Sequence, residues 1–110
     1  MATKYYREYL IPAATTETTI YTVPDANTAI VRSLRVTNTG STATDITVNH
    51  YAAGDATAHV LQKTRSIGGT STFDVFAGVP CILEAGDVLK VLSSQANVTF
   101  YLSYLEVDRN

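Results

Sequence analysis

The 110-residue sequence lacks tryptophan and holds one cysteine, three prolines and six glycines. Because Cys81 stands alone, no disulfide can form within the chain. Charged residues make up 16% of the sequence, and the net charge is -2. Because nucleic acids and anionic membranes bind basic surfaces, neither is an expected partner. No apolar run approaches the roughly 20 residues of a membrane-spanning helix. The charged N-terminal residues do not resemble a signal peptide, which predicts synthesis and assembly in the cytoplasm.

The sequence also lacks a constellation for chemistry. Neither His50 nor His59 accompanies a serine or cysteine in a motif of nucleophilic catalysis. His50 falls in an alternating strand pattern and is predicted to be a partly buried structural residue, and Cys81 is predicted to be a buried thiol. The acidic residues are scattered singly rather than at metal-ligand spacing. We therefore expect no enzyme activity, no metal, no cofactor and no small-molecule substrate.

What the sequence does hold is an abundance of threonine, valine, isoleucine and tyrosine, which favour strands. Turn signals recur about every 8–12 residues, the spacing of a sandwich or barrel. Between them we predict seven or eight strands, near residues 18–23, 29–38, 45–51, 59–63, 71–76, 81–84, 87–92 and 97–107. The expected fold is all-β: a single antiparallel β-sandwich, jelly-roll or immunoglobulin-like, over residues 18–110. An N-terminal arm and linker over residues 1–17 precede it.

Two of these strands depart from simple alternation. Arg32 interrupts the apolar positions of the strand at 29–38, which predicts a β-bulge or an outward-leaning start. The strand at 97–107 is apolar on both faces, with Tyr101 and Leu105 on the face opposite the core positions. That second face is either covered within the sandwich or meets another subunit.

The N-terminal segment is rich in tyrosine, with Tyr5, Tyr6 and Tyr9 beside Arg7. Tyrosine and arginine are enriched in the cores of protein interfaces. One interpretation is an arm that reaches a neighbouring subunit. The other is that residues 6–11 form the first strand of the chain's own sandwich. The sequence favours neither over the other.

Two segments resemble small β-sandwich virion proteins of tailed bacteriophages. The first runs from Ile20 through the Tyr-Thr-Val-Pro run to Asn38, and resembles their opening hairpin. The second, Ile82 to Val91, contains the Leu-Glu-Ala-Gly-Asp turn and resembles their late hairpin. The resemblance implies a non-catalytic structural protein, present in many copies in the virion and assembled in the host cytoplasm.

Within that resemblance, a capsid decoration or cement protein is preferred over a tail, neck or fibre-base component. Its partners would be further copies of itself, with a trimer favoured, and a major capsid or tail protein. A carbohydrate-binding module is the alternative from another class. For Arg32 and Arg35, an ordinary solvated strand face is also possible. The residues predicted to form the protein interface are Tyr5, Tyr6, Arg7, Tyr9, Arg32, Arg35, Tyr101, Tyr104 and Leu105.

Overall fold

The computed structural model describes residues 3–54, 57–76 and 80–108. Over these residues the chain forms strands and no helix, which confirms the all-β prediction. Strands β2 to β9 occupy the eight predicted ranges, with differences of a few residues at their ends. The strands are β1 (Thr3–Leu10), β2 (Thr18–Thr22), β3 (Asn27–Asn38), β4 (Thr44–Tyr51), β5 (His59–Ile67), β6 (Thr72–Asp74), β7 (Cys81–Leu83), β8 (Val88–Ser93) and β9 (Val98–Asp108).

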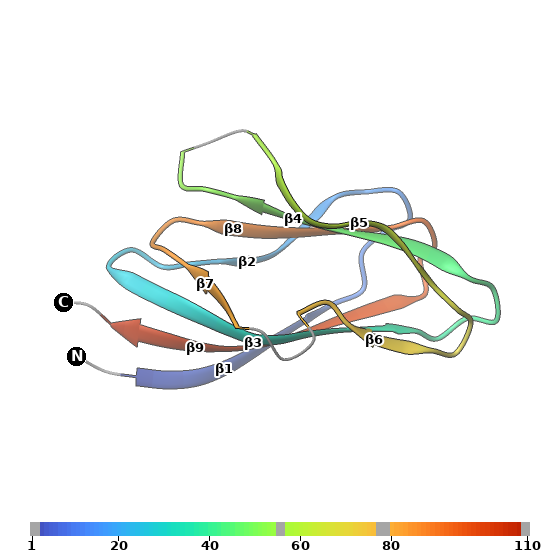
Figure 1. Cartoon of the computed structure of the whole chain (residues 1–110), viewed down its shortest axis with the longest axis horizontal. Helices are drawn as coiled ribbons and strands as arrows, with labels where there is room; N and C mark the ends of the chain where they lie inside the picture. Colours follow the sequence, from blue (N-terminus) through green and yellow to red (C-terminus); the bar gives the residue numbers. More distant parts are fainter. Residues whose placement is uncertain (1–2, 55–56, 77–79, 109–110) are drawn as a thin grey trace.

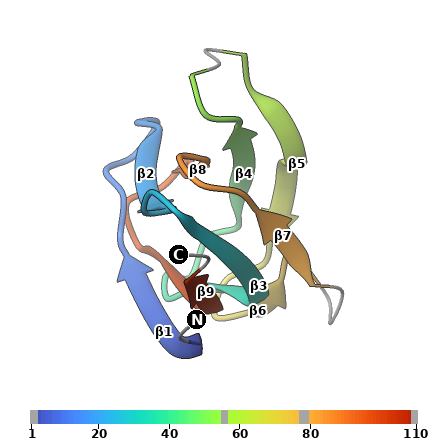
Figure 2. The same ribbon diagram turned by 90° about the vertical axis from the view of Figure 1, so that its left-hand side faces the viewer.

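The strands form two antiparallel sheets that lie one over the other (Figure 1). Sheet A has the order β1-β9-β3-β6, and β7 pairs with the same strand, β3, near its other end. Sheet B has the order β2-β8-β4-β5. Figure 2 shows the two layers end-on, with β1 at one edge of sheet A. The chain crosses between the layers several times, and only β4 to β5 and β6 to β7 are consecutive strands of the same sheet within the described residues. The two layers form a β-sandwich.

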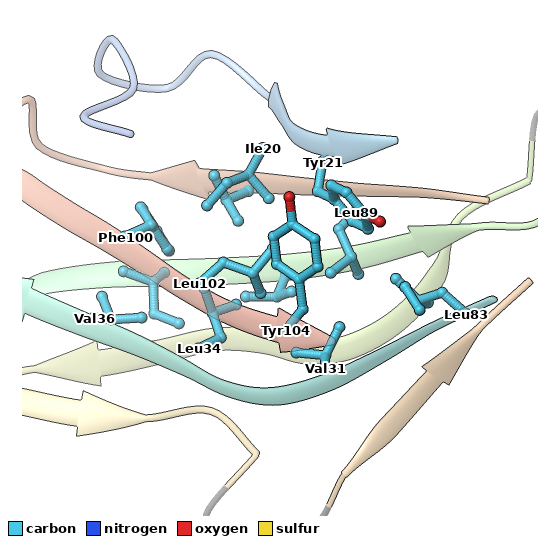
Figure 3. Close-up of a cluster of buried hydrophobic side chains, with 14 of the residues drawn as sticks. Ile20, Tyr21, Val31, Leu34, Val36, Leu83, Leu89, Phe100, Leu102 and Tyr104 are labelled. Carbon is cyan, nitrogen blue, oxygen red and sulfur yellow. The ribbon is translucent and has the colours of Figure 1, made fainter. Parts of the chain in front are cut away.

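The core lies between the two sheets because each strand alternates apolar and polar residues. On β9, Phe100 and Leu102 are fully buried, and on β4, Ile46 and Val48 are fully buried against them from the other layer. Figure 3 shows Phe100 and Leu102 of β9 together with Leu34 and Val36 of β3 in the space between the two sheets. Burying side chains of this size contributes about 1.5–3 kcal/mol each, so this layer is the main source of stability.

The N-terminal segment is a strand of the same sandwich. β1 pairs antiparallel with β9 from Thr3 opposite Val107 to Leu10 opposite Phe100, without a register shift. Of the two interpretations of this segment, the structure agrees with the one in which it forms a strand of the chain's own sandwich. This strand begins three residues earlier than the predicted range of 6–11. The division into an N-terminal arm and linker over 1–17 and a sandwich over 18–110 stays a prediction.

The predicted irregularity at Arg32 is present. The pairing of β3 with β9 shifts register between Val31 and Ser33, so Arg32 is the additional residue of a β-bulge. Val31 before the bulge is buried, and Arg32 is exposed. The bulge turns this arginine to the solvent side of sheet A without moving the apolar residues of β3 out of the core.

Candidate interface on the outer face of sheet A

The face of sheet A that points away from sheet B carries a row of apolar side chains. Strand pairing aligns Tyr5 on β1 with Leu105 on β9, Leu105 with Ile30 on β3, and Ile30 with Ile82 on β7. We call these four residues the apolar row. Ile82 is 66% exposed and Tyr5 is 74% exposed. Apolar side chains that line up across four strands at the surface are typical of a contact site.

A second row crosses the same face farther along the strands and combines tyrosine with charge. Pairing aligns Tyr9 with Tyr101, Tyr101 with Arg35, and Arg35 with Asp74. The rings of Tyr9 and Tyr101 are stacked, with centroids 6.5 Å apart and planes 11° from parallel. The Arg35 guanidinium carbon lies 5.7 Å from the Tyr101 ring centroid, within the range of a cation–π contact. This tyrosine–arginine row presents flat rings and a fixed cation to solvent.

Between the two rows the surface is hollowed. The hollow has a volume of about 710 Å³ and is open to solvent rather than enclosed. Arg7 from β1 and Arg32 from the bulge lie on its two sides, with Ser103 between them. Two arginines beside a shallow hollow suit bidentate contacts to carboxylates of a partner protein. The residues that line it are Tyr5, Tyr6, Arg7, Tyr9, Arg32, Tyr101, Ser103 and Tyr104.

Strand alternation places most of the predicted interface residues on this one face. The seven are Tyr5, Arg7, Tyr9, Arg32, Arg35, Tyr101 and Leu105. The other two, Tyr6 and Tyr104, are paired with each other on the inner side of the sheet. Tyr6 is 43% exposed at the sheet edge and stacks on Tyr104, with ring centroids 5.7 Å apart.

Tyr104 belongs to the core rather than to an exposed surface. Its side chain is only 4% exposed, and Figure 3 shows it extending toward β2. Its ring centroid lies 4.2 Å from that of Tyr21, and its hydroxyl donates a hydrogen bond of 3.2 Å to Glu8. Burial, together with the nearby Glu8 carboxylate, raises the pKa of Tyr104 well above its usual range. We therefore leave Tyr104 out of the proposed interface.

Two residues of the apolar row, Ile30 and Ile82, were not among the predicted interface residues. Ile30 shares its even-numbered phase with Leu34 and Val36, which are buried, so the alternation of the strand predicted that Ile30 also faces the core. Ile82 lies in a strand of three residues, which is too short for an alternation to be recognised. The expectation that Ile30 faces the core was wrong, because the bulge at Arg32 reverses the alternation and buries Val31 in its place.

The ionisable side chains that could take part in a reaction have structural roles instead. Asp87, in the turn before β8, accepts hydrogen bonds from His50 Nε2 at 2.9 Å and from the backbone N–H groups of Ala53 and Glu84 at 3.0 Å. Burial would raise the pKa of Asp87, but these hydrogen bonds outweigh it and hold the pKa below its usual value. His50 is thus a partly buried residue that binds the turn before β8, and the sequence predicted its partial burial but not this hydrogen bond.

Cys81 is half-buried at the start of β7 and packs against the core. Burial, with the nearby Asp87 carboxylate, raises the pKa of its thiol, which keeps it protonated and a poor nucleophile at neutral pH. Over the described residues, no three histidine, cysteine, aspartate or glutamate side chains are grouped so that they could hold a metal ion. In the same part of the chain there is no helix long and apolar enough to cross a membrane.

Comparison with known proteins gives likeness in structure only. No family model matches the chain, and no curated protein matches its sequence. Among solved structures, it is similar to a protein of Bacillus endospore appendages, described as a novel family of disulfide-linked pili. The TM-score is 0.59 at 16% identity, over 96% of this chain and 84% of that chain.

The chain is also similar to proteins of infectious bursal disease virus. It matches a chain of the T13 viral particle with a TM-score of 0.57 at 9% identity, over 94% of this chain and 30% of that chain. It matches the VP2 subviral particle with a TM-score of 0.51 at 11% identity, over 94% of this chain and 32% of that chain. The chain thus spans about a third of the length of these viral proteins. At such identities the likeness shows a shared fold, found here in structural proteins of pili and viral particles.

Proposed function

We propose that the chain is a non-enzymatic structural protein of a virion that binds neighbouring subunits through the outer face of sheet A. The observation that carries the proposal is the apolar row, in which Tyr5, Leu105, Ile30 and Ile82 line up across four strands at the surface. Beside it, the tyrosine–arginine row supplies two of the three residue types that are enriched at binding hot spots. An ordinary solvated sheet face would alternate to polar residues at these positions.

We infer that the fold is a jelly roll rather than an immunoglobulin-like sandwich. The strand orders β1-β9-β3-β6 and β2-β8-β4-β5 are those of two interleaved Greek keys. Jelly rolls occur in viral capsid proteins and also in lectins. Because one fold serves several functions, the architecture supports the virion proposal only together with the surface described above.

The proposed station in the virion is capsid decoration, with a tail or neck component as the alternative. A decoration protein binds at symmetric points and holds neighbouring capsid subunits together. A small sandwich with exposed apolar and aromatic side chains on one broad face suits this role. The partners would be further copies, in a trimer or another closed ring, and a major capsid or tail protein. A weak single contact becomes strong when it is repeated over a symmetric shell.

A carbohydrate-binding module is the second candidate, and one observation favours it. Tyr9 is 68% exposed and lies nearly parallel to Tyr101, so the two rings form a small aromatic platform. Lectins share the jelly-roll architecture. The Arg35 guanidinium over Tyr101 favours protein binding instead, because it supplies a cation suited to a partner carboxylate.

The experiment compares two exposed aliphatic residues that lie on different sheets. Ile82→Arg places a charge in the apolar row, and Val60→Arg places one on β5 of sheet B, where Val60 is 52% exposed. We expect light scattering to show self-association of the purified chain that Ile82→Arg weakens and Val60→Arg leaves unchanged. Circular dichroism should show that both variants keep the fold. The virion proposal would be contradicted if the purified chain were monomeric and were retained on a polysaccharide column, and if the Tyr9→Ala variant were not retained.

A further inference from the structure

The edges of the two sheets differ in how open they are to a further strand. In sheet A, β6 and β7 have three residues each. In sheet B, β2 has one register shift against β8, and β5 has two against β4, with Thr64 at a φ of 44°. Short strands and bulges are the usual means by which proteins prevent their edges from pairing with another chain. These four strands are therefore poor acceptors of a neighbouring strand.

Strand β1 has neither protection. It has eight residues in one uninterrupted register with β9. Within residues 3–54, 57–76 and 80–108, β9 is the strand hydrogen-bonded to it, and its other side forms the edge of sheet A (Figure 2). Residues 4–9 are all exposed. A long regular strand of this kind is what β-augmentation uses, because its outward N–H and C=O groups are already aligned to bond another strand.

We propose that β1 pairs antiparallel with β1 of a second copy, about a two-fold axis that passes beside Tyr6. In this register Tyr6 lies opposite Tyr6 of the other copy, and Lys4 lies opposite Glu8. Tyr5 lies opposite Arg7. The sequence Lys-Tyr-Tyr-Arg-Glu at residues 4–8 is thus complementary to itself when one copy is reversed. Because a two-fold contact is self-complementary, each pair occurs twice.

The two sides of the joined sheet receive different contacts. Lys4 and Glu8 are on the inner side of sheet A, the side of their partners on β9, Glu106 and Leu102. There they form two pairs of opposite charge between the copies. Tyr5 and Arg7 are on the outer side and form two cation–π pairs. Cross-strand pairs of both kinds stabilise antiparallel sheets.

The charges exclude the neighbouring registers. A two-fold contact between antiparallel strands places one residue opposite its own copy. An axis beside Lys4, Arg7 or Glu8 would oppose two like charges directly, which destabilises a sheet. An axis beside Tyr5 places Lys4 opposite Tyr6 and forms no pair of opposite charge. The charged residues of β1 therefore discourage general edge pairing and select the register centred on Tyr6.

This inference rests on the proposed function only in that both require the chain to associate with itself. The two contacts meet at Tyr5 and Arg7 but extend in different directions, since the apolar row crosses the broad face to Ile82 and the β1 contact follows the sheet edge. Pairing through β1 would join two sheets A side by side, with both outer faces on the same side of the dimer.

The first test is a charge exchange in the Ile82→Arg variant, in which the contact through the apolar row is weakened. Sedimentation over a dilution series should give a dimer of the 11.9 kDa chain. Adding Lys4→Glu or Glu8→Lys alone should halve the mass of the sedimenting species. Each substitution places two like charges opposite each other in both pairs between positions 4 and 8. An equimolar mixture of those two variants should restore the dimer, since every opposed pair is then of opposite sign. Monomeric Ile82→Arg protein, undiminished dimers of both charge variants, or a mixture that stays monomeric would overturn the inference.

The second test reads the register directly. In a Cys81→Ala background, Tyr6→Cys should form a disulfide between copies under mild oxidation, because opposed residues have Cβ atoms about 4.5–5.5 Å apart. Glu8→Cys is the matched control, since its two copies would lie four residues apart along the strand, or about 14 Å. Cross-linking through a cysteine at position 5 or 7 in place of position 6 would refute the register.

The two proposals can fail separately. If Lys4→Glu has no effect while Ile82→Arg lowers the mass, the edge contact is wrong and the face contact stands. If Ile82→Arg has no effect while the charge exchange dissociates and restores a dimer, the edge contact stands and the proposed interface on the outer face is wrong.

Discussion

Asp87 offers a sharp test of how the sandwich is held together at the turn before β8. Its two carboxylate oxygens accept three hydrogen bonds, from His50, Ala53 and Glu84, and the residue is only 7% exposed. In Asp87→Asn one oxygen becomes an amide nitrogen, so the bonds to Oδ2 are lost and a buried N–H group faces another donor. A hydrogen bond to a charged group contributes about 1.5–3 kcal/mol, and a buried unpaired donor costs about as much.

We therefore expect Asp87→Asn to lower the free energy of unfolding by about 3 kcal/mol, a large part of the ~5–15 kcal/mol typical of a domain. The assay is urea unfolding at pH 7, followed by circular dichroism, with the exposed Asp45→Asn as the control. A loss below about 1 kcal/mol, no larger than that of the control, would refute the reasoning.

The same carboxylate predicts a pH dependence. Because the folded chain holds the pKa of Asp87 below its usual 3.8, the folded state binds fewer protons than the unfolded state just below that pH. The stability that Asp87 contributes is therefore complete above about pH 4 and is lost as the pH falls through the folded pKa. Asp87→Asn should lose less stability than the wild type between pH 5 and pH 3 on the same unfolding assay. An equal loss in both proteins would show that other groups control the acid transition.

Two further predictions concern the backbone and the buried tyrosines. Gly86→Ala should destabilise the chain by about 1–3 kcal/mol, because Gly86 has a φ of 83° and its new Cβ would lie 2.8 Å from that of Ala53. Gly68→Ala, with a contact of 3.3 Å to a flexible hydroxyl, is the control in urea unfolding, and equal losses would contradict the explanation. Burial raises the pKa of Tyr21 and Tyr104 above the usual 10.0, so stability should fall as the pH rises above 10, where the unfolded chain releases these protons first. Absorbance titration should show both tyrosines ionising only as the chain unfolds, and their ionisation in the folded chain near pH 10 would refute this.

Local patterns in the sequence predicted the strands because a strand is recognised from its own residues. The alternation that places Ile46 and Val48 in the core is visible within eight residues. The interruption at Arg32 is equally local, and it corresponds to the observed bulge. What these features share is that they depend on the pleat of a single strand, not on its neighbours.

The candidate interface depends on neighbours and could be predicted only in part. The apolar row joins residues from positions 5 to 105, and it exists because β9 pairs with both β1 and β3. A shift of one residue in any of these pairings would turn its side chains to the other face. Tyr104 illustrates the same limit, since its place in the alternation favours the core while its residue type favours an interface. In the observed register Tyr104 pairs with Tyr6 and with buried Val31, and this places its side chain on the core side of sheet A.

The molecule measures 46 × 27 × 20 Å, and β1 begins at the same short side at which β9 ends. Figure 1 shows β1 starting where β9 stops, and Thr3 is the direct neighbour of Val107. These two residues lie about one strand spacing apart, so a tag, dye or cargo domain joined to either end of the chain would be attached near that short side. Both proposed contacts begin near that side, since Lys4 follows Thr3 directly and Tyr5 pairs with Leu105, two residues before Val107. A bulky fusion at either end is therefore expected to interfere with both contacts.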